Sequence, residues 1–80
     1  MEEIKTKITG ILKSKKVDIV IPEDTSENLL DSGVIDSFDI VDLIGSLEMQ
    51  FGIVVDGDDI VPENFESVDA IAGLVGKYLK

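Results

Sequence analysis

The 80-residue chain contains no histidine, cysteine, tryptophan or arginine. Without His and Cys it lacks the nitrogen and sulfur ligands of zinc sites and the Ser-His and Cys-His pairs of nucleophilic enzymes. Without Cys it forms no disulfide, so nothing points to an oxidising compartment. No stretch approaches the about 18 apolar residues of a membrane span, and residues 1–12 lack the apolar run of a signal peptide. We therefore expect a soluble cytoplasmic protein without a specific metal site.

Basic residues are scarce and unevenly placed. Residues 1–16 contain five Lys and two Glu, whereas residues 17–76 contain fifteen Asp and Glu and no base, and the net charge is −10. Such a surface repels phosphate backbones and anionic headgroups, so we expect neither nucleic-acid binding nor membrane insertion. We expect a monomer whose partners present basic patches.

The length and the apolar content indicate one folded domain, residues 1–80. A chain of this size has no room for a second domain, and 44% hydrophobic residues suffice for one small core. The apolar content also argues against disorder despite the high charge.

Helical spacing of apolar residues predicts three helices. The first spans residues 2–16 and the second residues 37–51, with Asp36 as its N-cap, Asp39 at position N3 and Gly52 as its C-cap. The third begins after the capping residue Ser67, and its apolar face contains Val68, Ile71, Leu74, Val75, Tyr78 and Leu79.

The segments between these helices are expected to be loops. Residues 17–21 are predicted to form an extended loop, and Leu29 and Leu30 to return the chain to the core. Residues 53–66 form an acidic, turn-rich loop with a short helical turn near residues 58–61. A calcium-binding EF-hand starting at Asp56 is excluded, because its fifth and sixth positions are Ile60 and Val61.

The central helix has two apolar faces. The first is predicted to enter the core and contains Ile40, Leu43, Ile44, Leu47 and Phe51. The second contains Phe38, Val41 and Met49, with Gly45 between them, Asp42 and Glu48 on its flanks and Asp39 near its edge. Either the loop of residues 17–35 covers this second face, or the face docks a partner and its acids steer the encounter.

Gly45 also has two interpretations. A glycine inside a helix is a defect of about 1 kcal/mol relative to alanine. It is either a tolerated defect or a position where the missing side chain lets a partner approach closely.

Ser37 is expected to be the first residue of the central helix. Its hydroxyl would face solvent beside unpaired backbone N–H groups and the positive end of the helix dipole, which together would stabilise a phosphate ester. Taken alone, an Asp-Ser pair before a helix more often serves only as a cap.

The surroundings of Ser37 resemble a known family. The segment from Leu30 to Phe38, LDSGVIDSF, resembles the attachment loop of acyl carrier proteins, whose central Asp-Ser-[Leu/Met/Phe] matches Asp36-Ser37-Phe38. The following helix resembles that family's second helix, including Leu47-Glu48 and the segment FGI at residues 51–53. The resemblance covers nearly the whole chain.

The resemblance implies an all-α, right-handed four-helix bundle with a long first loop and a short third helix. Ser37 would bear a 4′-phosphopantetheine arm, transferred from coenzyme A by a separate phosphopantetheinyl transferase, with Asp36 capping the helix beside it. The chain would not be an enzyme. It would hold an acyl group as a thioester and present it to acyl-loading and acyl-transferring enzymes of lipid metabolism, such as fatty acid biosynthesis, or of specialised acyl metabolism.

The sequence departs from the commonest fatty-acid carriers. Gly33 lies four residues before Ser37 instead of three, which is more similar to D-alanyl carrier proteins. Gly45 stands where fatty-acid carriers usually have Met, and Met49 where they usually have an acid. A D-alanyl or aminoacyl carrier is therefore one alternative. An acidic helical interaction module without a cofactor is another, of a different class.

Overall fold

The computed structural model describes residues 2–15 and 24–79. These residues form three α-helices, α1 (Glu2–Lys15), α2 (Ser37–Phe51) and α3 (Val68–Leu79), and two 3₁₀ turns, η1 (Gly57–Asp59) and η2 (Pro62–Asn64). The described ranges contain no β-strand. The predicted extended loop at residues 17–21 lies outside them.

The all-α class is confirmed, but the count of four helices is not. One short helical turn was expected near residues 58–61, and the chain instead makes two 3₁₀ turns on either side of Ile60 and Val61. The Asp56 carboxylate caps η1 by accepting the N–H of Asp58 at 2.9 Å. Pro62 starts η2, where a missing N–H is harmless. Local chemistry therefore starts each turn separately.

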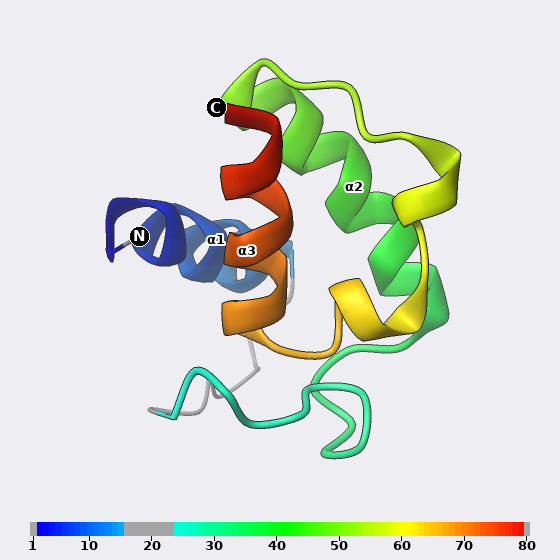
Figure 1. The fold of residues 1–80 in the computed structure, drawn as a ribbon. Coiled ribbons are helices and arrows are strands. Elements are labelled where there is room, and N and C mark those ends of the chain that lie inside the picture. The colour runs from blue at the N-terminus through cyan, green and yellow to red at the C-terminus, as the bar shows by residue number, and fades with distance from the viewer. Residues whose placement is uncertain (1, 16–23, 80) are drawn as a thin grey trace.

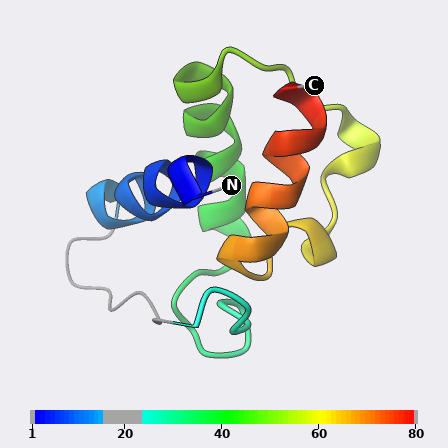
Figure 2. The ribbon, with the colours of Figure 1, turned by 60° about the vertical axis from the view of Figure 1, so that its left-hand side comes forward.

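The three helices enclose one apolar core. In Figures 1 and 2, α1 lies across the pair formed by α2 and α3. Ile8, Leu47, Phe65, Ile71 and Val75 are fully buried at its centre. Leu29 is also buried, so the prediction that the long loop returns to the core there is confirmed.

Caps define the ends of α2 and the start of α3, as the sequence predicts. Gly52 adopts the left-handed conformation (φ 66°), and its N–H donates to the carbonyl of Glu48. The Ser67 hydroxyl accepts the N–H of Ala70 at 3.0 Å and so caps α3. Both turns are fixed by local chemistry.

The C-terminal end of α3 holds the acidic loop. The Tyr78 hydroxyl donates to the Asp59 carboxylate and accepts the N–H of Asp56 at 2.9 Å, while Lys77 lies 3.1 Å from the same carboxylate. The hydrogen bonds from Tyr78 and Lys77 lower the pKa of Asp59 below its ordinary value. Leu79 was predicted on the buried face but is 48% exposed, because it occupies the last turn of the helix.

Two kinds of feature are absent from the described ranges. None of the helices is long and apolar enough to cross a membrane. No group of three or more acids among the described residues could hold a metal ion.

Candidate functional site

Ser37 is the first residue of α2, and its side chain is exposed. Within the described part of the chain, its hydroxyl has no hydrogen-bond partner. The hydroxyl therefore lies at the surface, at the positive end of the helix dipole.

The two aspartates beside Ser37 form a capping box. The Asp36 carboxylate accepts the N–H groups of Phe38 and Asp39, each at 3.0 Å, and the Asp39 carboxylate accepts the N–H of Asp36 at 2.9 Å. The capping prediction is confirmed. The expectation of unpaired N–H groups beside Ser37 is wrong for Phe38 and Asp39, because Asp36 occupies both. The dipole remains, but these two donors are not free for a phosphate.

The loop before Ser37 is held by its own backbone. The Asn28 side chain accepts the N–H groups of Leu30 and Asp31, and the Leu29 carbonyl accepts those of Val34 and Ile35. Gly33 has φ +80°, a conformation that favours glycine. This loop therefore delivers Ser37 in a defined position.

Buried contacts anchor the same loop to the rest of the molecule. Leu29 and Ile35 are 1% and 3% exposed, and the N–H of Leu29 donates to the Glu66 carbonyl at 2.5 Å. The loop thus lies against the segment that leads into α3.

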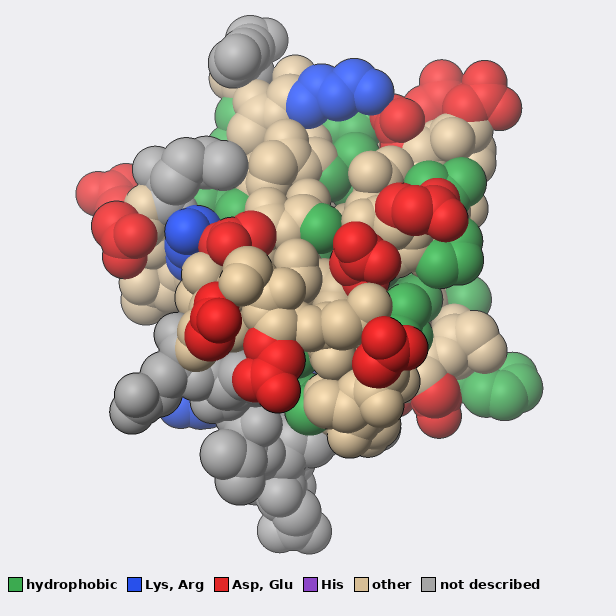
Figure 3. Space-filling model, turned by 60° about the horizontal axis from the view of Figure 1, so that its bottom comes forward, with side chains coloured by type: hydrophobic (Ala, Val, Ile, Leu, Met, Phe, Trp, Pro, Cys, Tyr) green, Lys and Arg blue, Asp and Glu red, His purple; other side chains and the backbone are tan. Residues whose placement is uncertain are grey.

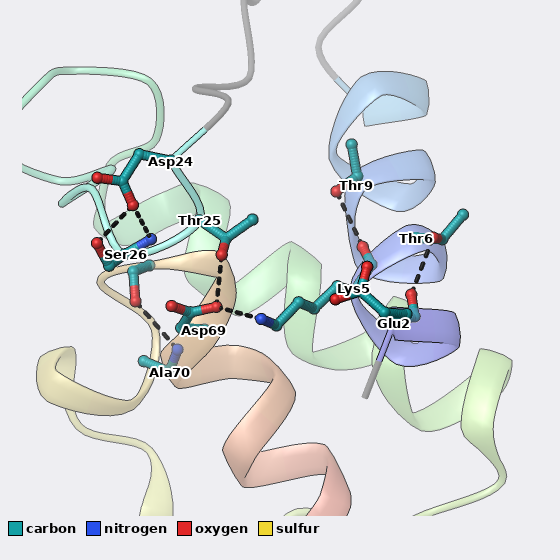
Figure 4. Close-up of polar contacts among 10 residues, drawn as sticks. Glu2, Lys5, Thr6, Thr9, Asp24, Thr25, Ser26, Asp69 and Ala70 are labelled. Atoms are coloured by element: carbon teal, nitrogen blue, oxygen red, sulfur yellow. Dashed lines mark hydrogen bonds and ion pairs between the residues drawn. The ribbon is translucent and has the colours of Figure 1, made fainter.

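A polar cluster ties the start of the described loop to two helices (Figure 4). Asp69 of α3 accepts a hydrogen bond from Thr25 at 2.6 Å and pairs with Lys5 of α1 at 2.8 Å. The backbone adds a bond from the N–H of Asp69 to the Thr25 carbonyl at 2.9 Å. The hydrogen bond from Lys5, and then that from Thr25, hold the pKa of Asp69 below its ordinary value.

The two apolar faces of α2 are separated as the sequence predicts. Ile40, Leu43 and Leu47 are buried, whereas Phe38, Val41 and Met49 are 84%, 70% and 88% exposed. We call these three exposed residues, together with Gly45, the α2 stripe. The described part of the long loop, residues 24–35, does not cover this face, because all three side chains are exposed. The role of the stripe in docking stays a prediction.

Gly45 lies in the α2 stripe without an internal packing reason. A Cβ atom at this position would meet nothing within 4 Å. No described part of the chain therefore requires glycine here, and Gly45 lies one helical turn from both Val41 and Met49.

The acids around the α2 stripe have partners within the molecule. Asp39 belongs to the capping box. The Glu48 carboxylate is half-buried and accepts the N–H of Val55 at 3.0 Å, and Asp42 lies 3.2 Å from Lys15 of α1. Asp42 and Glu48, the two acids predicted to steer a partner, are thus engaged within the molecule, and so is Asp39.

The molecular surface is acidic beyond α2. Figure 3 shows one face on which Asp and Glu side chains dominate, with few basic groups and several hydrophobic side chains among them. A basic partner surface would find complementary charge here.

An open cleft of about 690 Å³ lies elsewhere, between the ends of all three helices, where Ile4, Lys7, Phe51 and Leu79 contribute to its lining. It is near the last residue of α2, about 20 Å along the helix from Ser37. The cleft is therefore not part of the site around Ser37.

Comparison with protein families explains this combination of features. The model of the phosphopantetheine attachment site family matches residues 2–75, which is nearly the whole chain. The chain belongs to the phosphopantetheine attachment site family. Comparisons with curated proteins and with solved structures gave no match.

Family membership fixes the cofactor and the general role. The carrier domain is an attachment site for covalent 4′-phosphopantetheine, and such domains are typically non-catalytic and work with a phosphopantetheinyl transferase and partner enzymes. The alternative of an interaction module without a cofactor is therefore set aside. The residues around Ser37 fit such a group, because the exposed hydroxyl has open space around it and no internal partner in the described chain.

Proposed function

We propose that Ser37 is the attachment residue and that the protein is an acyl carrier. The observation that supports this most strongly is the exposed Ser37 hydroxyl at the capped N-terminus of α2, inside a chain of the attachment-site family. The sequence contains a second Asp-Ser pair, Asp31-Ser32, but the Ser32 hydroxyl donates to the Leu29 carbonyl at 3.3 Å and no helix begins there. Ser37 is thus the better candidate of the two.

In this proposal the chain's own residues position the attachment point. Asp36 and Asp39 hold the start of α2, and the buried anchors Leu29 and Ile35 hold the loop before it. When bound, the arm supplies a terminal thiol on which an acyl group is held as a thioester, which a chain without cysteine cannot supply. Because it presents this group to other proteins, the carrier needs no enclosed substrate pocket of its own.

The α2 stripe is the proposed docking surface. Phe38, Val41 and Met49 offer apolar contact along the helix that begins at Ser37, and Asp42 adds charge at the edge. Asp39 and Glu48 contribute negative potential while their carboxylates hold the backbone. Acyl-loading and acyl-transferring enzymes with basic docking patches are the partners that fit this surface.

The proposed cargo is an acyl group of lipid or specialised acyl metabolism. An aminoacyl cargo is the second candidate, and the spacing of Gly33 four residues before Ser37, at φ +80°, supports it through its similarity to D-alanyl carriers. Both cargoes would use the same attachment residue.

Intact-mass measurement tests the proposal. The protein is incubated with coenzyme A and a broad-specificity phosphopantetheinyl transferase. The Ser37 oxygen would form a phosphodiester as the pyrophosphate bond of coenzyme A breaks, and adenosine 3′,5′-bisphosphate would leave with that oxygen's proton passing to the transferase or solvent. We expect the native chain and Ser32→Ala to gain one arm and Ser37→Ala to gain none. An arm on folded Ser37→Ala would contradict the assignment.

A further inference from the structure

Asp42 of α2 has a cation of another helix as its partner. The carboxylates of Asp36 and Glu48 accept backbone N–H groups. Asp42 instead lies 3.2 Å from the Lys15 ammonium group, a cation contributed by α1. This ion pair offsets the charge of an acid that adjoins the α2 stripe.

The position of Asp42 makes this neutralisation relevant to docking. Asp42 is one helical turn from Phe38 and three residues before Gly45, so it adjoins the middle of the α2 stripe. Its side chain is 69% exposed and remains reachable from outside, whereas that of Lys15 is 30% exposed. A partner that uses Asp42 therefore meets it already paired with Lys15.

We propose that Lys15 determines which partners dock, by competing with the partner's own cation for Asp42. This inference rests on the proposed docking role of the α2 stripe. A partner whose surface is apolar opposite Asp42 would leave the internal pair in place and gain nothing from the acid. A partner with a cation there must displace the Lys15 ammonium group.

The chemistry of the competitor favours arginine. A guanidinium group forms two parallel hydrogen bonds with a carboxylate, whereas the ammonium group of Lys15 approaches one oxygen of Asp42 as a point charge. The chain itself contains no arginine, so no internal group can form the bidentate pair. Lys15 would thus select partners with an arginine opposite Asp42 over partners with a lysine.

The experiment measures arm transfer by a phosphopantetheinyl transferase with coenzyme A, and separates KM for the carrier from kcat. Lys15→Met removes the competing cation. Lys13→Met is the matched control, because it removes the same charge from the same helix and Lys13 forms no ion pair with a described acid. Two further variants, Asp42→Asn and the double variant with Lys15→Met, complete a double-mutant cycle.

We expect Lys15→Met to lower KM about two- to fivefold at low salt, the range for one exposed ion pair, with kcat unchanged. Lys13→Met should lower KM less, through net charge alone. The difference should shrink as the Debye length falls from about 30 Å to about 8 Å between 0.01 M and 0.15 M salt. In a chain that already contains Asp42→Asn, Lys15→Met should lower KM no more than Lys13→Met does. The melting temperatures of the lysine variants should stay close to that of the native chain.

Three other outcomes overturn the inference, and they separate it from the docking proposal. If Lys15→Met and Lys13→Met have the same KM while Asp42→Asn raises KM, Lys15 does not compete for Asp42, but Asp42 still takes part in docking. If the effect of Lys15→Met persists without Asp42, the lysine acts through another group. If Asp42→Asn leaves KM unchanged, Asp42 takes no part in docking, and both proposals fail at this residue while Ser37 attachment stays unaffected.

Discussion

Asp36 and Asp39 cap the N-terminus of α2 for each other, with Ser37 between them. The Asp36 carboxylate accepts the N–H of Asp39 at 3.0 Å, and the Asp39 carboxylate accepts the N–H of Asp36 at 2.9 Å. Neither bond uses the Ser37 hydroxyl. The cap therefore does not depend on whether that hydroxyl is free or esterified. The helix terminus can stay intact while the arm is attached.

Removing the cap should destabilise the fold, whereas removing the hydroxyl should not. Asp36→Ala should lower the free energy of unfolding by about 1 kcal/mol, because two N–H groups lose their acceptor. Ser37→Ala should change it by less than about 0.5 kcal/mol, as is usual at exposed positions. Urea denaturation of both variants measures this. A larger loss for Ser37→Ala than for Asp36→Ala would contradict the cap geometry.

The two faces of α2 should respond oppositely to truncation. Leu47 is fully buried, so Leu47→Ala should lower the free energy of unfolding by about 2–5 kcal/mol. Met49 is 88% exposed, so Met49→Ala should change stability by less than about 0.5 kcal/mol. Met49→Ala should instead raise KM for arm transfer. Thermal melts and transfer kinetics on the same samples test the pair. A destabilised Met49→Ala with an unchanged KM would place Met49 in the core.

Acid should weaken the contacts of Asp69 with Lys5 and Thr25. Its lowered pKa means that the stability contributed by its bonds to Lys5 and Thr25 is present above the ordinary carboxyl pKa of 3.8 and is lost as pH falls through the lower folded value. The melting temperature of the native chain should therefore exceed that of Asp69→Asn at neutral pH. This difference should disappear below pH 3.8. Asp31→Asn, at an exposed position, serves as the control. A gap that widens on acidification would be the opposite of this prediction.

Salt should stabilise the protein. Fifteen acids without a base between residues 17 and 76 repel one another, and screening that repulsion should outweigh the weakening of the ion pairs of Lys5, Lys15 and Lys77. We expect the melting temperature to rise with sodium chloride and to rise further with millimolar magnesium or calcium, which neutralise neighbouring carboxylates. Calorimetry at increasing concentrations of sodium chloride, and of magnesium or calcium, measures the melting temperature. A flat or falling trend would show that the ion pairs dominate.

The local features of the fold could be read from the sequence because their causes lie within a few residues. Asp36, Gly52 and Ser67 cap helices through neighbours at most four residues away, and helical periodicity distinguishes Leu47 from Met49. The α2 stripe and the exposure of Ser37 follow from the same periodicity.

The remaining features depend on contacts between distant segments. Lys15 meets Asp42 only because α1 crosses α2, and Glu48 reaches the N–H of Val55 only after the chain reverses at Gly52. Both acids were predicted as free steering charges, since periodicity gives the face of a residue and not its partner. The position of η1 likewise involves a distant residue, because Tyr78 anchors Asp56 and Asp59 from the end of α3.

Locating the arm by fragmentation mass spectrometry tests the central claim most directly. After transfer from coenzyme A, the protein is digested and the modified peptide is sequenced in the gas phase. The account predicts one arm per chain, on Ser37, with Ser32 in the same loop unmodified. An arm on Ser32, or on any residue other than Ser37, would contradict it.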